Sequence, residues 1–323
     1  VYLVYTSPVQ LSTTHYASSG VYLKASKITD LQANISVKTF LSNALKSNQS
    51  LILETEILDA DGNRVALSQK KVNVKAEEKN VAFESLMTIT QPKRWDVDSP
   101  YIYKVYSRLK NKKEEVLDCV VNPLGIREYR FDAEKGFFLN GKYRKLIGTS
   151  RHQDYKGMGN ALRDEMHIRD VQLSKDMGSN FLRVAHYPQD PVVMQMCDKL
   201  GLLTSVEIPV VNAITQSKAF MDNCVEQVTE MVYQNYNYPS VIIWAYMNEV
   251  LLRPPFNPEN RTERADYMTF LHQIASAVEA QIRSLDSERY TMLPCHSASQ
   301  IYQEAGITEL PMLLGFNLYN GWY

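Results

Sequence analysis

The chain has 323 residues, of which 45% are hydrophobic and 22% are charged. This length and hydrophobic content are enough for two or three globular domains with real cores. Thirty-five basic residues almost balance 36 acidic ones, so the formal net charge is -1 and no basic surface for nucleic acid is implied. No stretch reaches the ~20 consecutive apolar residues that a membrane helix needs.

The cysteine pattern argues against both a zinc knuckle and a disulfide framework. The four cysteines stand far apart in hydrophobic surroundings, with no Cys-x-x-Cys pair among them. We therefore predict four buried thiols. They are Cys119, Cys197, Cys224 and Cys295.

The two ends of the chain look cut. It opens on the strand-like run 1–5, without an initiator methionine and without the basic and apolar regions of a signal peptide. The compartment is therefore left open, and a periplasmic or secreted location is compatible with this pattern. Residues 1–20 are expected to be the end of a preceding domain and a linker.

The first part of the chain, to about residue 121, alternates apolar and polar residues. The alternation is clear in residues 35–39, 51–57 and 101–105, and a period of two predicts half-buried strands. Asp61-Gly62 lies between two such runs and supplies the positive φ of a tight hairpin turn. These features predict an immunoglobulin-like β-sandwich over residues 21–123.

After about residue 124 short apolar runs alternate with segments of helical period. Apolar stripes over 221–232 and 267–282 each predict a helix that buries one face. The predicted strands are Arg144 to Thr149, Phe181 to Val184, Leu203 to Glu207, Val241 to Tyr246, Tyr290 to Pro294 and Leu313 to Leu318. Such a repeat allows either an open doubly wound sheet or a closed (β/α)₈ TIM barrel.

Polar residues favour the barrel. They come at or just after the ends of different predicted strands, where a barrel collects its active site. A nucleotide-binding doubly wound sheet would instead show a glycine-rich first turn, whereas residues 150–156 contain no glycine. We predict an incomplete TIM barrel of about six βα units over residues 124–323, truncated before strand seven.

Glu249 is the best candidate for an acid catalyst. It follows the apolar run 241–247 and Asn248, so its carboxyl is expected at the barrel mouth beside aromatic surface. Partial desolvation there favours the protonated carboxyl that cleavage of a glycosidic bond requires, and Asn248 can donate to a sugar 2-hydroxyl. For the dipeptide alone, a plain polar end of a strand is an equal alternative.

Six segments in chain order resemble glycoside hydrolase family 2, and together they cover nearly the whole chain. They are residues 94–101, the link 131–142, Arg151-His152-Gln153-Asp154, residues 183–188, residues 239–249 and residues 317–323. Any one segment is a weak match, but the ordered set is specific. The resemblance implies that this chain is an internal fragment of a retaining exo-β-glycosidase.

The resemblance also implies roles for particular residues. Glu249 matches the family's acid/base. The residues expected to bind or orient the sugar are Asn248, Arg183, His186, Tyr187, His152, Asp154, Tyr319 and Trp322. Glu207 and His296 are expected to support them. Alternatives remain open: a surface salt bridge for Arg183, a structural role for a lone histidine, and a core or interface role for Trp322.

Two departures from the family matter. The family's nucleophile follows strand seven, beyond Tyr323, so we expect this chain alone to show no normal turnover. An open barrel also exposes strand edges and apolar surface, so we expect self-association, such as a homo-oligomer, or low solubility. Residues 211–213 lack the Glu-x-His pair of metal-dependent β-galactosidases, so no metal or cofactor is expected and magnesium is doubtful.

The expected partner is a β-linked oligosaccharide or glycoside, with no nucleic acid and no membrane. The stretch 151–154 favours β-galactosidase, while β-glucuronidase and β-mannosidase share the architecture and remain alternatives. A hypothesis of another class is a carbohydrate-binding module that kept the fold and lost the chemistry. Intact Glu249, Asn248 and Arg183 favour the enzyme.

Overall fold

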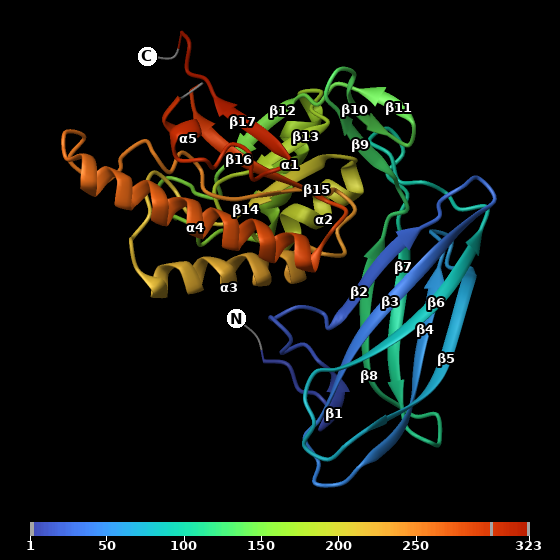
Figure 1. The fold of residues 1–323 in the computed structure, drawn as a ribbon. Helices are drawn as coiled ribbons and strands as arrows, with labels where there is room; N and C mark the ends of the chain where they lie inside the picture. The colour runs from blue at the N-terminus through green and yellow to red at the C-terminus, as the bar shows by residue number, and fades with distance from the viewer. Residues whose placement is uncertain (1–2, 298–299, 322–323) are drawn as a thin grey trace. The chain divides into compact units, whose positions relative to one another are not determined.

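The computed structural model describes residues 3–297 and 300–321, and the chain forms two compact units (Figure 1). The first unit contains residues up to 146, together with 198–201 and 233–239. The second contains residues 147–197, 202–232 and 240 onward. Each unit therefore has its own core and is described by itself.

The first unit is mainly a sandwich of two antiparallel sheets. Its strands are β1 (Val9–Leu11), β2 (Val21–Ser26), β3 (Gln32–Asn43), β4 (Gln49–Leu58), β5 (Arg64–Val74), β6 (Val81–Thr90), β7 (Tyr103–Lys110) and β8 (Val116–Leu124). In one sheet β1, β2 and β6 all pair with β3; the other has the order β5-β4-β7-β8. The predicted sandwich is confirmed.

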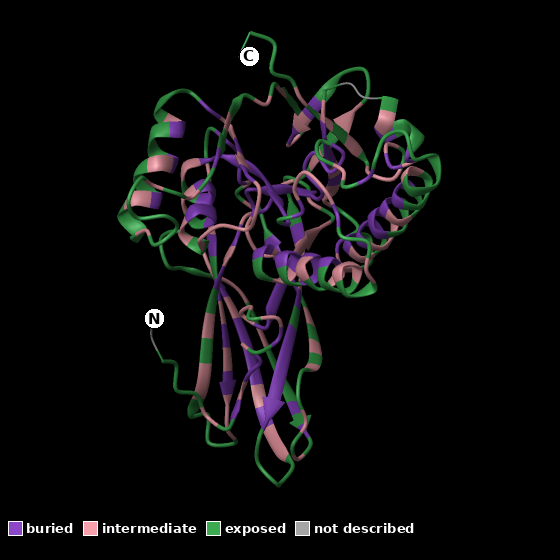
Figure 2. Ribbon diagram, turned by 90° about the vertical axis from the view of Figure 1, so that its left-hand side faces the viewer, coloured by how far each residue is buried: buried purple, intermediate pink, exposed green. Residues whose placement is uncertain are grey.

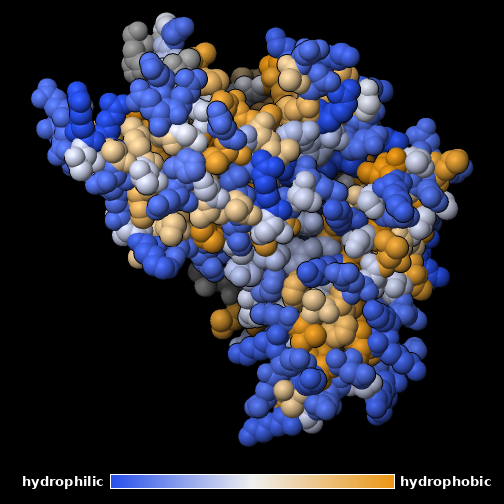
Figure 3. Space-filling model, in the orientation of Figure 1, coloured by the Kyte–Doolittle hydropathy of each residue, from blue (hydrophilic) through white to orange (hydrophobic). Residues whose placement is uncertain are grey.

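Alternation along the strands builds the sandwich core. Ile35 of β3, Leu53 of β4 and Val105 of β7 are each at most 2% exposed, and Figure 2 shows buried segments along strands of the sandwich. Burying a side chain of this size contributes roughly 1.5–3 kcal/mol. Some apolar side chains, such as Leu86, stay exposed, and Figure 3 shows hydrophobic surface over the sandwich among hydrophilic side chains.

The predicted hairpin turn joins β4 to β5. Gly62 has a φ of +86°, which a glycine adopts without strain, and Asp59 N donates to Asn63 O at 2.9 Å. The Asp59 carboxylate also accepts hydrogen bonds from Asp61 N and Asn63 N. The side chain therefore closes the turn that Asp61-Gly62 predicted.

Two expectations for the first unit need correction. The stretch 1–20, expected to be an earlier domain's end and a linker, contributes β1, whose three residues pair with Leu41–Asn43 of β3. The sequence pattern did not predict this strand, because three residues are too few to show the alternation of apolar and polar residues. Cys119 is exposed, whereas the other three cysteines are buried, because its position on β8 faces outward.

A small sheet completes the first unit. It consists of β9 (Tyr129–Asp132), β10 (Gly136–Leu139) and β11 (Lys142–Arg144), paired antiparallel. The strand predicted from Arg144 to Thr149 therefore starts later, as β12, at Gly148. A Cβ atom at Gly148 would lie 1.6 Å from Phe181 O, so only glycine permits the close backbone approach there.

The second unit is a curled parallel sheet covered by helices. Its strands are β12 (Gly148–Arg151), β13 (Phe181–Val184), β14 (Leu203–Glu207), β15 (Val241–Ala245), β16 (Tyr290–His296) and β17 (Leu313–Asn317). They lie side by side in chain order (Figure 1). A doubly wound sheet would reverse its strand order, so the predicted half-barrel of six strands is confirmed.

Helices follow five of these strands. They are α1 (Asp164–Asp176), α2 (Pro191–Leu200), α3 (Lys218–Asn235), α4 (Arg261–Leu285) and α5 (Gln300–Glu304). The predicted stripe of α4 is buried, with Tyr267, Leu271 and Ile274 at 0% exposure, and Asn260 caps the helix by accepting from Glu263 N at 3.2 Å. Within residues 3–297 and 300–321, no helix is long and apolar enough to span a membrane.

Candidate active site

Polar side chains from four strands of the parallel sheet meet at one of its edges. Arg183 lies near the end of β13, Glu207 ends β14, Asn248 follows β15, and Asn317 ends β17. Parallel strands present their carboxyl ends at the same edge, where barrel enzymes place their catalytic groups. The topology therefore gathers residues that are far apart in the sequence.

Arg183 is the centre of this cluster. Its Nη1 donates to Asn317 Oδ1 at 3.0 Å, and its Nη2 donates to Asn248 Oδ1 at 2.7 Å and to Glu207 Oε2 at 3.2 Å. The side chain is only 18% exposed. A rigid guanidinium fork with several donors suits such a junction, and this geometry does not support the alternative of a surface salt bridge.

Glu207 braces its neighbours with both carboxylate oxygens. The side chain is 1% exposed, and besides Arg183 it pairs with His186, whose Nδ1 lies 2.7 Å from Glu207 Oε1. A carboxylate can only accept, so Nδ1 carries the hydrogen in this contact. Glu207 thus contacts Arg183 and His186 through its two oxygens, and its supporting role stays a prediction.

Glu249 is buried and held by two donors. It is 5% exposed, and its Oε1 accepts from Asn317 Nδ2 at 2.7 Å and from Tyr319 OH at 2.8 Å. Its φ of 53° and that of Met247, 60°, lie in the left-handed region that few side chains adopt. Glu249 N donates to Pro294 O at 2.9 Å, so neighbouring structure fixes a backbone conformation of the kind found at functional sites.

His152 and Tyr187 lie beside His186. The ring centroids of His152 and His186 are 4.9 Å apart, and those of His152 and Tyr187 are 5.9 Å apart. Desolvation by these neighbours, and then the charge of His186, lowers the pKa of His152. The neutral ring is therefore favoured near pH 7, and it can exchange hydrogen bonds with a hydroxyl.

Other predicted site residues lie apart from the cluster. Asp154 is exposed, and its charge acts on His152. His296 contacts α5 through its Nδ1, which lies 2.8 Å from Tyr302 OH, and burial raises the pKa of Tyr302. Trp322 lies outside the described residues.

Two polar residues of the site were not predicted. Asn317 contacts three members of the cluster, and Asn212 N donates to Asn248 O at 3.0 Å. The sequence carried one signal for Asn317, since it precedes Tyr319 by two residues and alternate strand residues share a face. No local pattern marks Asn212.

The described ranges 3–297 and 300–321 contain no group of three or more His, Cys, Asp or Glu side chains arranged to hold a metal ion. The expectation of no metal and no cofactor therefore stays a prediction.

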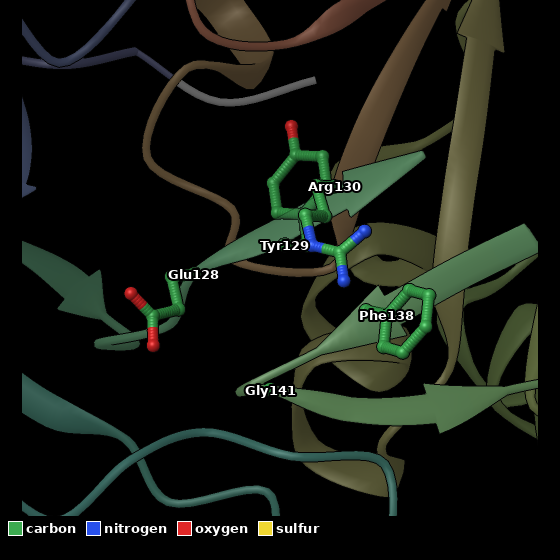
Figure 4. Close-up of a pocket in the computed structure, with 5 residues that line it drawn as sticks. All are labelled: Glu128, Tyr129, Arg130, Phe138 and Gly141. Atoms are coloured by element: carbon green, nitrogen blue, oxygen red, sulfur yellow. The ribbon is translucent and has the colours of Figure 1, made fainter. Parts of the chain in front are cut away.

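A hollow of about 290 Å³ in the first unit offers no comparable chemistry. Its lining includes Glu128, Arg130 and Phe138, and Figure 4 shows the Arg130 guanidinium beside the Phe138 ring, 3.9 Å from its centroid. The charged groups already have partners, since Arg94 donates to Glu128 and Arg130 donates to Asp132. The candidate active site is therefore the edge of the parallel sheet.

The chain matches two models of known protein families. Residues 132–310 match the family described as Glycosyl hydrolases family 2, TIM barrel domain, and residues 18–127 match Glycosyl hydrolases family 2. The chain belongs to glycoside hydrolase family 2. The resemblance of its six ordered segments is thereby confirmed.

Several proteins are similar to this family 2 chain. A β-glucuronidase of Bacteroides fragilis is 33% identical over 100% of the chain and 44% of its own length. A β-galactosidase of Bacteroides ovatus is 30% identical over 78% of the chain and 29% of its own length. A structure of Bacteroides uniformis β-glucuronidase 2 covalently bound to cyclophellitol-6-carboxylate aziridine is 35% identical, with a TM-score of 0.92, covering 96% of this chain and 37% of that one. The chain thus spans less than half the length of these relatives.

Proposed function

We propose that the protein containing this family 2 chain is a retaining β-glycosidase with Glu249 as its acid/base. The observation that carries the proposal is the Glu249 carboxyl, 5% exposed and oriented by two donors at the edge of the half-barrel. Asn248 and Arg183 lie beside it in one hydrogen-bonded cluster. Such a carboxyl can give a proton to a leaving oxygen and later take one from water.

The reaction needs a second carboxylate. It attacks the anomeric carbon while Glu249 protonates the departing oxygen, and the glycosyl-enzyme ester is then hydrolysed by water that gives its proton to Glu249. Glu207 is poorly suited, since Arg183 and His186 engage both of its oxygens. We place the nucleophile on a seventh strand beyond residue 323. The covalent complex of the Bacteroides uniformis relative supports a retaining mechanism.

We propose a β-glucuronide as the first substrate class to test and a β-galactoside as the second. A β-glucuronidase of Bacteroides fragilis and the Bacteroides uniformis β-glucuronidase 2 are 33% and 35% identical over at least 96% of the chain, whereas the Bacteroides ovatus β-galactosidase is 30% identical over 78%. The stretch 151–154, which favoured a galactoside, is partly structural. Arg151 holds Asp170 of α1 at 2.8 Å, and Gln153 accepts from Asp190 N just before α2.

The test is hydrolysis of 4-nitrophenyl β-glucuronide, β-galactoside and β-mannoside by the full-length gene product that carries this sequence. The 323-residue chain is assayed beside it, together with Glu249→Gln and Glu226→Gln variants of the full-length protein. Glu226→Gln is the control, because Glu226 is an exposed glutamate of α3. We expect turnover of one glycoside by the full-length protein and by Glu226→Gln alone. A folded full-length protein that binds these sugars without cleaving any would favour the carbohydrate-binding module.

A further inference from the structure

Asn317 occupies a fixed place at the end of β17. Its backbone pairs with His296 of β16, and its carbonyl accepts from Ser297 N at 3.0 Å. The side chain is half-buried and turned toward the active-site cluster. Since the backbone is anchored on one side, the amide group is presented to the cluster in a defined position.

The orientation of the Asn317 amide follows from its partners. Arg183 Nη1 can only donate, so the amide atom 3.0 Å from it must be the oxygen. The nitrogen then faces Asn248 Oδ1 at 3.0 Å and Glu249 Oε1 at 2.7 Å. An amide nitrogen has two hydrogens and these are two acceptors, so one orientation satisfies every contact.

This orientation also sets the amide of Asn248. Its Oδ1 accepts from Asn317 Nδ2 and, at 2.7 Å, from Arg183 Nη2. Two donors on one oxygen exclude the flipped amide, which would put two N–H groups against them. The Nδ2 group of Asn248 is thereby kept as a donor for a sugar hydroxyl, a contact that strengthens in the transition state.

The Asn317 amide also makes the two carboxyl oxygens of Glu249 different from each other. Asn317 Nδ2 and Tyr319 OH both donate to Oε1, and a carboxyl oxygen has two lone-pair directions. The proton of the acid form is therefore carried by Oε2. A general acid works only when its proton faces the departing oxygen, so this choice of oxygen has a catalytic consequence.

We propose that Asn317 is a positioning residue, whose single amide orients Asn248 for the sugar and places the catalytic proton on Glu249 Oε2. The proposal rests on the proposed function of Glu249. It differs from a packing role because it predicts effects on proton delivery. Asn317 itself need not touch the substrate.

The test uses Asn317→Ala and Asn317→Asp in the full-length protein. Removing a donor that favours the carboxylate keeps Glu249 protonated to higher pH, so the alkaline limb of kcat/KM should rise by roughly one pH unit in Asn317→Ala. Asn317→Asp places a negative charge beside Glu249, so it should raise the alkaline limb of kcat/KM further. Loss of proton placement should slow an alkyl glycoside by roughly 10- to 100-fold, and a 2,4-dinitrophenyl glycoside much less, since its leaving group needs little protonation.

Tyr319→Phe removes the second donor to Glu249 Oε1 and keeps the shape of the side chain, so it should also raise the alkaline limb of kcat/KM. This variant can be measured even if both Asn317 variants fail to fold. Phe316→Leu is the control, because Phe316 lies on the other face of β17 and is 49% exposed; its limb should not move. An unmoved limb with equal losses for both leaving groups would reduce Asn317 to a packing residue. If the wild-type protein cleaves no β-glycoside, the proposed function fails and this proposal fails with it.

Discussion

The sandwich and the half-barrel each hold buried carboxylates in a hydrogen-bonded network, and the two networks differ in where their groups lie along the strands. In the sandwich, Glu54 accepts from Lys110 at 2.6 Å, from Gln69 at 2.6 Å and from Arg108 at 3.1 Å. Burial raises the pKa of Glu54, but the hydrogen bonds from Lys110 and Gln69 outweigh it and lower the pKa. All these residues lie on paired strands, within the ladder of one sheet.

In the half-barrel, the corresponding groups lie at strand ends and on the segments after them. Glu249 and Met247 have positive φ, and the amide oxygen of Asn248 accepts from both Arg183 and Asn317. A network inside a ladder satisfies its own groups and stabilises a sheet. A network at strand ends can leave donors and acceptors for a substrate, which is what an active site requires.

The largest expected effect is loss of activity at Glu249. Glu249→Gln removes the proton that the leaving oxygen needs, so kcat for a poor leaving group should fall by roughly 10²- to 10⁴-fold. The melting temperature should change little, because glutamine keeps the size and an acceptor for Asn317 and Tyr319. Steady-state kinetics with thermal unfolding measure both, and equal activity in the variant would remove Glu249 from the mechanism.

Glu207 should couple activity to stability. Glu207→Gln leaves Arg183 and His186 without their carboxylate in a site where Glu207 is 1% exposed. Unpairing a buried ion pair of this kind costs roughly 3 kcal/mol. Urea unfolding should show that loss together with a fall in kcat, and a variant that lost only activity would point to direct chemistry at Glu207.

Asp286 should make the second unit sensitive to acid. Burial alone would raise its pKa, but the charge of Arg289 and hydrogen bonds from its neighbours lower the pKa from 3.8 to about 2. The stabilisation from this group is therefore complete above about pH 4 and is lost as the pH falls through 2, a change of roughly 2 kcal/mol. The free energy of unfolding, measured between pH 5 and pH 2, should fall less steeply with acid in Asp286→Asn than in the wild type. An identical pH dependence in the two proteins would contradict a role of Asp286 in acid sensitivity.

The smallest expected effect belongs to the sandwich. Glu54→Gln removes ion pairs to Arg108 and Lys110, whose side chains are 23% and 15% exposed. Because both cations can reach water, the loss should be about 1 kcal/mol. Turnover should stay within twofold of the wild type. A large loss of activity would mean that the sandwich network is coupled to the active site.

Local patterns predicted most of the elements. β13 and β14 have the bounds expected from their apolar runs, and the stripe of α4 is buried as predicted. The misses came where a pattern is too short or too local. β1 has three residues, and Cys119 lies on an outward position of β8 that its surroundings in sequence did not reveal.

The sequence by itself determined the order of elements, the Asp61-Gly62 turn and the family, because these depend on periods and motifs read within short stretches. Only the tertiary structure decided the partners within the site. Arg183 and Asn317 are 134 residues apart in the chain, and curling of the parallel sheet brings them to 3.0 Å. The orientation of an amide depends on which donors and acceptors surround it, and that set exists only once the strand ends have come together.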